Sequence, residues 1–341
     1  MKKYNVAVVG ATGAVGGEMI EVLEQEKLPI KKLVLLASKK SAGKTIEFNG
    51  EKIVVQELVE NIFEQEKIDI ALFSAGGSVS KKFAPIATKS KVVVIDNTSF
   101  FRMQEDVPLV VPEVNPEDIR SWSKTGIIAN PNCSTIQMVM ALKPLDDVFD
   151  IKRVNVSTYQ AVSGTGTKAM NELIEQMKDV LNFEFENSVP SVYPYKIALN
   201  AIPQIDVFTD SGFTKEEEKM IFETQKILHK KIQVAATCVR VPILRGHSEA
   251  VSVTFAKETS AEEVRNLLKT AKGVVVQDEP ENLKYPMPLN CIGLDETFVG
   301  RIKSDLHDKK IVHFWCVADN LRVGAASNAV KIAREWIKQN S

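Results

Sequence analysis

The segment NPNCST at residues 130–135 places one cysteine, Cys133, where an apolar stretch gives way to an expected helix. A thiol in the first turn of a helix meets backbone N–H groups and the positive end of the helix dipole, which favour the nucleophilic thiolate. Asn132 and the neighbouring amides could also hold a developing oxyanion. The alternative interpretation is a buried structural thiol, the commoner state of cysteine. The hexapeptide alone leaves both interpretations open.

A glycine-rich turn with the spacing G-x-x-G-x-x-G lies between an expected first strand, residues 4–9, and an expected first helix, residues 18–25. Such glycines allow a tight turn and a close approach of the backbone to a pyrophosphate, whose charge is met by the helix N-terminus. We therefore predict dinucleotide binding by Gly10, Ala11, Thr12, Gly13, Ala14, Val15 and Gly16.

The next expected strand, residues 33–37, ends in Ser38 and Lys39, followed by Lys40. NAD enzymes commonly place an acidic residue here for the ribose hydroxyl, whereas a hydroxyl and cations suit a 2′-phosphate. We predict NADP as the cofactor, bound in part by Ser38 and Lys39. The alternative is that the lysines belong only to a solvated loop.

The order of elements predicts two domains. Strands and helices alternate over residues 1–129, with further apolar strands at 68–74 and 92–96, which indicates an α/β, Rossmann-like, doubly wound domain. Later residues show longer helices and alternating strands, at 154–160, 237–241, 250–256 and 312–318, which indicates an α+β domain over 130–321. The apolar face of the last helix, within 322–341, predicts that it completes the first domain.

Local signals place three of these later helices. Thr214 with Glu217 and Ser260 with Glu263 resemble capping boxes. Apolar residues at helical spacing over 165–181 are typical of a core or an interface.

The composition argues against several functional classes. Hydrophobic residues make up 44% of the 341 and charged residues 26%, which is ordinary for a soluble globular protein. A formal net charge of -1 provides no basic field for nucleic acid. Charges interrupt every apolar run before it could span a membrane. Four dispersed cysteines and four histidines without ligand spacing predict a reducing, cytoplasmic location and no metal.

Three further segments contain candidate site residues: YQAVSG at 159–164, CVRVP at 238–242 and RGHSE at 245–249. In this order, together with NPNCST and GATGAVG, they make the chain similar to the aspartate-semialdehyde dehydrogenase family, from Val6 to Arg322. The resemblance implies an NADP-dependent, reversible, phosphorylating oxidation of L-aspartate 4-semialdehyde to L-4-aspartyl phosphate. That reaction belongs to lysine, methionine, threonine and diaminopimelate biosynthesis. It also implies that the second domain is catalytic and carries the subunit interface of a homodimer, with a tetramer as the alternative.

The resemblance implies a role for each site residue. Cys133 would add to the aldehyde, the adduct would lose hydride to the nicotinamide, and inorganic phosphate would cleave the resulting thioester. His247 would act as general acid and base, because an imidazole titrates near neutral pH. The other implied roles are orientation of the substrate by Gln160, pairing with its α-carboxylate by Arg240, pairing with its ammonium by Glu216, phosphate binding by Arg102, Lys219 and Asn97, and contact with the nicotinamide by Ser163, Gly164 and Asn320.

Some of these assignments have alternatives. Arg240 could instead belong to a buried ion pair. Glu217 and Glu218 adjoin Glu216, so a shift of one residue would change the acidic group in the site. Lys219 follows Glu216 by three positions, so one helix face could carry both charges.

Two other functions compete with this interpretation. N-acetyl-glutamyl-phosphate reductase is similar in fold, cofactor and cysteine chemistry, but its cysteine typically follows a glycine, where this chain has Asn132. Arg240, seven residues before His247, also favours the aspartyl enzyme. A catalytically silent NADP-binding sensor is disfavoured because Cys133, Gln160, Arg240 and His247 are all present.

Overall fold

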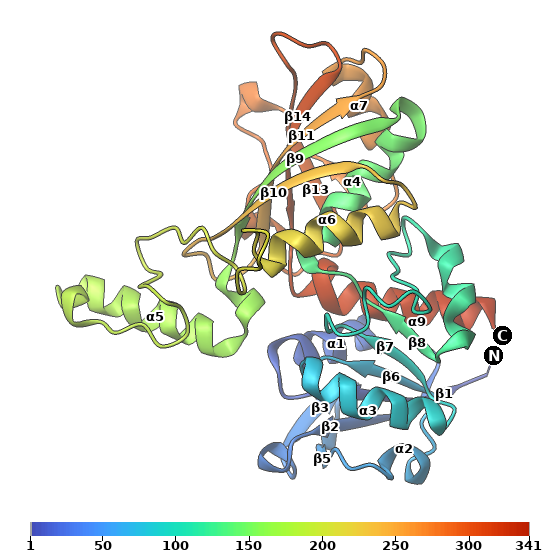
Figure 1. The fold of residues 1–341 in the computed structure, drawn as a ribbon. Helices are drawn as coiled ribbons and strands as arrows, with labels where there is room; N and C mark the ends of the chain where they lie inside the picture. Colours follow the sequence, from blue (N-terminus) through green and yellow to red (C-terminus); the bar gives the residue numbers. More distant parts are fainter. Residues whose placement is uncertain (1, 341) are drawn as a thin grey trace. The chain divides into compact units, whose positions relative to one another are not determined.

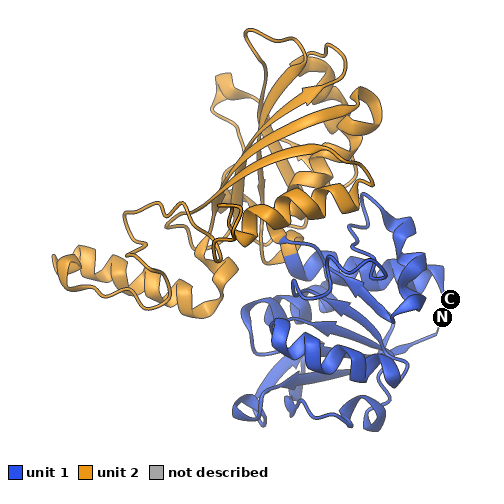
Figure 2. Cartoon of the chain, viewed as in Figure 1, with its two compact units in different colours: residues 1–132, 325–341 blue, residues 133–324 orange. Residues whose placement is uncertain are grey.

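The computed structural model describes residues 2–340 and forms two compact units, coloured blue and orange in Figure 2. Unit 1 comprises the residues up to 132 and those from 325 onward, and unit 2 comprises residues 133–324. Each boundary lies three residues beyond the one expected from the sequence, after 132 rather than 129 and after 324 rather than 321.

Unit 1 is built on a parallel six-stranded sheet with the order β5-β2-β1-β6-β7-β8 (Figure 1). Its central strands are short apolar runs that are buried on both faces, as a sheet covered by helices on both sides requires. The predicted doubly wound, Rossmann-like fold is confirmed. The strands are β1 Tyr4–Val9, β2 Ile30–Ala37, β5 Gln56–Glu57, β6 Ile70–Phe73, β7 Val93–Asp96 and β8 Ile127–Ala129.

The helices of unit 1 bury apolar faces against this sheet. Helices α1 (Ala14–Gln25) and α9 (Ser327–Gln339) pack on each other and share a core with Val6 and Val8 of β1. Helix α3 (Gly77–Lys89) packs on β7. The smaller elements are 3-10 helices at Lys39–Ser41 and Pro116–Lys124, helix α2 Ile62–Gln65, and a hairpin of β3 Thr45–Phe48 and β4 Glu51–Val54.

Unit 2 contains a mixed six-stranded sheet with the order β10-β9-β11-β14-β13-β12. Side chains alternate between its two faces, so Thr158 and Gln160 of β9 lie on the buried face and Tyr159 lies on the other. The predicted α+β fold of the second domain is confirmed. The strands are β9 Ile151–Gln160, β10 Gln233–Arg240, β11 His247–Phe255, β12 Val274–Val276, β13 Thr297–Ser304 and β14 Ile311–Ala318.

Helices α4 (Cys133–Phe149), α6 (Lys215–Ile227) and α7 (Ala261–Leu268) pack on the buried face of this sheet. Both predicted capping boxes are present, at the starts of α6 and α7. Helix α5 (Thr167–Leu181) lies away from the sheet (Figure 1). The remaining elements are α8 Pro288–Cys291, 3-10 helices at Val162–Thr165, Phe185–Asn187 and Pro280–Asn282, and a π-helical turn at Arg322–Ala326.

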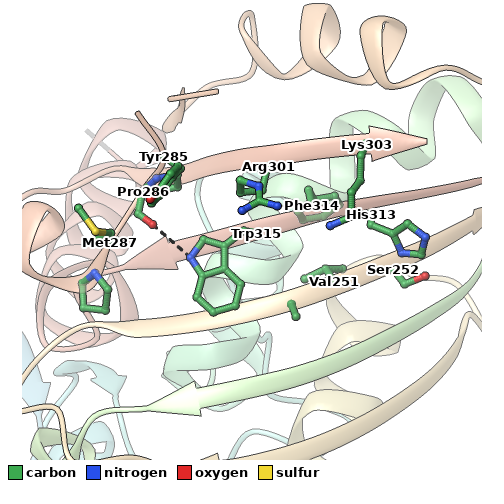
Figure 3. A pocket seen from close by; sticks show the side chains of 12 residues that line it. Val251, Ser252, Tyr285, Pro286, Met287, Arg301, Lys303, His313, Phe314 and Trp315 are labelled. Atoms are coloured by element: carbon green, nitrogen blue, oxygen red, sulfur yellow. Dashed lines mark hydrogen bonds between the residues drawn. The ribbon is translucent and has the colours of Figure 1, made fainter. Parts of the chain in front are cut away.

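The other face of the unit 2 sheet carries a hollow of about 580 Å³ between β11, β14, β13 and residues 285–288 (Figure 3). Trp315 lies in it, donates from its indole N–H to the carbonyl of Pro286 (3.1 Å), and packs beside Tyr159 with ring centroids 5.4 Å apart. This hollow therefore lies on the face opposite to the one that carries Gln160. Among residues 2–340, no helix has the length and apolar character needed to cross a membrane.

The C-terminal helix supplies a test of how unit 1 is held together. Trp336 of α9 is only 8% exposed, and its ring packs edge-on against Tyr4 of β1 and Trp122. We expect Trp336→Ala to lower the free energy of unfolding of this unit by roughly 3–5 kcal/mol, because it leaves a large cavity. Denaturant titration followed by circular dichroism would measure this loss.

The matched control is Lys338→Ala on the same helix, whose side chain is 77% exposed and which should change stability by less than about 0.5 kcal/mol. Equal effects of the two substitutions would contradict the assignment of α9 to the core of unit 1.

Candidate active site

Cys133 is the first residue of α4, and its side chain is half-buried. This position gives the thiol the environment of a helix N-terminus, as the sequence predicts. Gly324 packs directly against it: a Cβ at residue 324 would lie 2.5 Å from the Cβ of Cys133 and 2.9 Å from its Cα. Only glycine fits there, which was not evident from the sequence.

The other three cysteines have a different environment. Cys238, Cys291 and Cys316 are all buried. Burial raises the pKa of each thiol, to about 12 for Cys291, where the charge of Asp319 adds to the effect. These are inert structural thiols. Of the four cysteines, Cys133 has the access and the helix position of a nucleophile.

Gln160, Arg240 and His247 meet where β9 and β10 end and β11 begins. The register pairs Gln160 with Arg240, and all three side chains are buried on the helix-covered face. The backbone of Ala161 links two of them: its N–H donates to Nδ1 of His247 (3.0 Å), and its carbonyl accepts from Nη1 of Arg240 (2.6 Å). The Nε2 atoms of Gln160 and His247 lie 3.4 Å apart.

His247 is electrically neutral in this environment. Burial and, to a smaller extent, the charge of Arg240 lower its pKa to about 3, although Glu216 opposes both effects. Because Nδ1 accepts the Ala161 N–H, Nε2 is the nitrogen that carries hydrogen in the neutral ring. The expectation that this imidazole titrates near neutral pH therefore does not hold in this structure.

Arg240 has a buried hydrogen-bond donor that no described residue accepts from. It is 4% exposed, and its Nε has no hydrogen-bond partner among the described residues. The ring of Tyr193 lies 5.9 Å from its guanidinium carbon, and the Tyr193 hydroxyl donates to Thr165 (3.0 Å). A buried N–H of this kind can be satisfied by an ordered water, an ion or a bound ligand. Tyr193 was not predicted, because no sequence motif marks it.

The loop that carries Tyr193 is anchored to α5. The carboxylate of Glu172 accepts from the backbone N–H groups of Ser191 and Val192 and from the Ser191 hydroxyl. The side-chain oxygen of Gln176 accepts from the N–H groups of Ile197 and Ala198.

The three adjacent glutamates at the start of α6 have separate partners. Glu216 accepts from Nε2 of Gln160 (3.1 Å) and pairs with Lys219 (3.1 Å). Glu217 closes the capping box and accepts from the N–H of Cys238 (3.0 Å), whereas Glu218 accepts from the hydroxyl of Thr209. Glu216 is thus the one that faces Gln160, and Lys219 shares its helix face.

Ser163, Gly164 and Asn320 adjoin this cluster. Oδ1 of Asn320 accepts from the N–H of Gly246 (2.9 Å), and its side chain also bonds the Ser163 hydroxyl. A Cβ on Gly164 would lie 3.2 Å from Nη1 of Arg240 and 3.4 Å from Nε2 of His247. Glycine therefore leaves the space next to these two groups open.

The glycine turn in unit 1 fits a dinucleotide. Gly10 has φ +90°, and a Cβ at Gly16 would lie 2.1 Å from the Gly10 carbonyl oxygen, so glycine is required where α1 begins. Thr12 donates to Ser41 (3.2 Å), which ties the turn to the loop holding Ser38 and Lys39 at the end of the neighbouring strand β2. Ser38 and Lys39 are exposed there.

A second glycine-containing loop was missed at this edge. Residues 74–77 (SAGG) connect β6 to α3, and a Cβ on Gly10 would come within 3.0 Å of Ser74 and Ala75. The N-termini of α1 and α3 therefore lie at the same edge of the sheet, and their backbone N–H groups suit a pyrophosphate. The available signal was the glycine pair directly after an apolar strand.

The remaining predicted residues fall in both units. In unit 1, Nη2 of Arg102 donates to the carbonyl of Asn97 (2.9 Å), and Asn97 also accepts from the side chain of Asn130. Asn132 is buried and is the last residue of unit 1 before Cys133. Lys219 lies in unit 2. The described residues contain no cluster of three or more histidine, cysteine or acidic side chains arranged to hold a metal.

Comparisons with known proteins place both units in one family. Residues 5–122 match "Semialdehyde dehydrogenase, NAD binding domain" and residues 142–323 match "Semialdehyde dehydrogenase, dimerisation domain". The chain is 58% identical to aspartate-semialdehyde dehydrogenase of Campylobacter jejuni, over 99% of this chain and 98% of that protein. It is 51% identical to the enzyme of that name from Bacillus subtilis, over 98% of each chain.

Solved structures of aspartate semialdehyde dehydrogenases superpose on this chain over nearly its whole length. Aspartate semialdehyde dehydrogenase II of Vibrio cholerae, complexed with ASA, superposes with a TM-score of 0.94 at 46% identity, covering 99% of both chains. The enzyme of Candida albicans with NADP gives a TM-score of 0.74 at 26% identity, again covering 99% of both chains.

The contrast among the thiols predicts selective alkylation. Under native conditions near neutral pH, iodoacetamide should modify Cys133 alone, because burial and a raised pKa protect the other three. Intact mass should show one adduct per chain, and peptide mapping should locate it. Cys133→Ser should remain unmodified, and denatured protein should take up four adducts. Modification of Cys238, Cys291 or Cys316 at a rate similar to that of Cys133 would contradict this assignment.

Proposed function

Because the chain belongs to the aspartate-semialdehyde dehydrogenase family, we propose that it catalyses the NADP-dependent, reversible, phosphorylating oxidation of L-aspartate 4-semialdehyde to L-4-aspartyl phosphate through a thioester on Cys133. This reaction would serve lysine, methionine, threonine and diaminopimelate biosynthesis in the cytoplasm. The observation that carries the proposal is the buried pair of opposite charges, Arg240 and Glu216, on either side of Gln160.

These two charges match the amino-acid end of the substrate. The unpartnered Nε–H of Arg240, with its guanidinium plane beside Tyr193, is suited to a bidentate pair with an α-carboxylate. Glu216 would bind the α-ammonium. An N-acetylated substrate has no such cation, so a buried carboxylate here disfavours N-acetyl-glutamyl-phosphate reductase as the alternative.

The chemistry at the carbonyl follows from Cys133 and His247. The Cys133 thiolate adds to the aldehyde carbon, and the carbonyl oxygen becomes an oxyanion that accepts a hydrogen bond from the Nε2–H of His247. A thiolate enters and a phosphate oxygen later displaces a thiolate, so the bonds made and broken at carbon need no proton carrier, and the proton of hydrogenphosphate leaves to water when the acyl phosphate forms. A neutral imidazole that donates a hydrogen bond is therefore sufficient. We propose this role in place of general acid and base catalysis, with Asn132 as a further donor.

The residues present fit NADP. The turn at residues 10–16 would meet the pyrophosphate, together with the loop at 74–77, while Ser38 and Lys39 would meet the 2′-phosphate. Ser163, Gly164 and Asn320 would border the nicotinamide. Bound NADP would supply the hydride acceptor in the oxidative direction and the hydride donor in the reverse direction.

Arg102, Lys219 and Asn97 are the proposed ligands of inorganic phosphate. Arg102 uses Nη2 on the Asn97 carbonyl, and Lys219 is shared with Glu216 and Asp206. These ion pairs hold the Lys219 ammonium next to the proposed substrate-binding carboxylate, and we propose that phosphate binds beside it.

We propose a homodimer formed through unit 2, with a tetramer as the alternative. The match to a dimerisation domain over residues 142–323 supports self-association. The face of the sheet that carries Tyr159, Trp315 and the hollow is the surface we assign to the partner copy (Figure 3).

The decisive experiment is phosphate-dependent NADP reduction with L-aspartate 4-semialdehyde, measured beside N-acetyl-glutamate semialdehyde and with NAD as the alternative acceptor. We expect turnover only with the aspartyl substrate and phosphate, and more with NADP than with NAD. Cys133→Ser should abolish turnover and leave NADPH binding, followed by fluorescence, nearly unchanged. Turnover with only the N-acetyl substrate would establish the reductase, and NADP binding without turnover would establish the sensor.

Arg240→Lys tests the carboxylate site. Lysine keeps the charge but loses the planar fork, so KM for the semialdehyde should rise roughly 10- to 100-fold while KM for NADP stays the same. The control is Arg120→Lys, an exposed arginine of unit 1, which should have no effect on either constant. An unchanged KM for the semialdehyde would exclude Arg240 as its carboxylate ligand.

A further inference from the structure

Thr158 lies behind Gln160 on the same face of β9. It is fully buried, and its hydroxyl donates to Oε1 of Gln160 at 2.9 Å. Alternation along a strand places residues two apart on one face, so this contact follows directly from their spacing. None of the roles assigned above uses Thr158.

The contact holds the oxygen end of the Gln160 carboxamide on the side away from Glu216. A carboxamide has one oxygen acceptor and one nitrogen with two donor hydrogens. The Glu216 carboxylate can only accept, so it takes Nε2 of Gln160 (3.1 Å), and the Thr158 hydroxyl donates to Oε1 at the other end. Nε2 of Gln160 also lies 3.4 Å from Nε2 of His247, and because both nitrogens carry hydrogen they make no hydrogen bond with each other. A half-turn of the amide would bring its oxygen against the Glu216 carboxylate.

Of the three neighbours of the Gln160 carboxamide, Thr158 is the one that the proposed substrate does not reach. Glu216 and His247 both face the proposed substrate, so their interactions with Gln160 change when substrate binds. Thr158 lies inside the sheet, opposite Cys238 of β10 and Glu249 of β11 in the strand registers. Its β-branched side chain is stiff at χ1, and both neighbouring strands fix its backbone.

We propose that Thr158 is a positioning residue whose hydroxyl holds the Gln160 carboxamide with its NH₂ group toward Glu216, His247 and the bound substrate. This inference rests on the proposed function, because it assigns Gln160 to substrate orientation.

The test compares two substitutions at Thr158. Thr158→Val removes the hydroxyl at nearly constant shape, and Thr158→Ser keeps it. We expect Thr158→Val to lower kcat/KM for the semialdehyde about tenfold, with KM for NADP unchanged, whereas Thr158→Ser stays within about twofold of the wild type. The matched control is Thr297→Val, a fully buried threonine of β13 whose hydroxyl contacts Met140 instead, and it should keep wild-type kcat/KM.

A double-mutant cycle separates positioning from a general structural role. In a Gln160→Leu background, Thr158→Val should cause no further loss of kcat/KM, because its effect passes through the amide. Independent, multiplying losses would overturn the proposal, as would an equal loss in Thr158→Ser and Thr158→Val. If Thr158→Val fails to fold, Thr158→Ala takes its place in the cycle.

A measurement that does not depend on turnover tests the role of Thr158 separately from the proposed function. The side-chain amide signals of Gln160 in ¹⁵N-labelled protein should shift in Thr158→Val and stay in place in Thr158→Ser. Unmoved signals in both variants would overturn the positioning role even in an active enzyme. A wild-type protein that does not oxidise the semialdehyde, but whose Gln160 signals respond as expected, would overturn the proposed function alone.

Discussion

The candidate site depends on the backbone of Ala161, since its N–H binds His247 and its carbonyl binds Arg240. The N–H lies in the rigid peptide plane shared with Gln160, and the carbonyl lies in the next plane, shared with Val162, so two planes joined at one Cα position the two side chains. The first plane continues β9, which pairs with β10 and β11, and the second is held by a hydrogen bond from the Val162 N–H to the Ile243 carbonyl. The placement of the imidazole and the guanidinium therefore depends on the sheet and on the turn that directly follows β9.

Burial then sets the charge of each group in this cluster. Desolvation keeps His247 neutral and raises the pKa of Glu249, two residues along β11, well above its usual value, with Glu216 adding to the effect. The other ionisable groups beside Gln160 are the guanidinium of Arg240 and the carboxyl group of Glu216, which pairs with Lys219. Burying charged groups costs free energy of desolvation, and the proposed binding of a zwitterionic substrate would give these two charges their partners.

Much of the fold followed from sequence patterns with a direct physical meaning. Apolar runs such as Tyr4–Val9 and the glycine turn after it marked the parallel sheet, and the capping residues Thr214 and Ser260 marked helix starts. Strand β13 escaped notice because Arg301 and Lys303 interrupt its apolar positions, and the exposed first residues of β2 hid where that strand begins.

The site could be assembled only in part from motifs. Cys133, Gln160, Arg240 and His247 lie in recognisable segments, but Gly324 and Tyr193 reach them through tertiary packing that no local signal records. The choice among the three glutamates at the start of α6 had an unused sequence signal: Glu217 belongs to the capping box, so it could not also face the site. The neutral state of His247 depends on burial and on the Ala161 amide, which only the folded chain reveals.

The Tyr193 loop is anchored to α5 through Glu172 and Gln176. Changes in this loop are therefore physically separate from changes in the residues that α4 and the sheet carry. The Cys133 thiol, the imidazole and the guanidinium are carried by α4 and the sheet, whereas Tyr193 comes from a segment whose attachments are to α5. Residues in that segment can vary in size or polarity without disturbing the register of β9, β10 and β11. A redesign aimed at longer or acylated aldehydes would therefore begin with this loop, and the reacting groups could be left as they are.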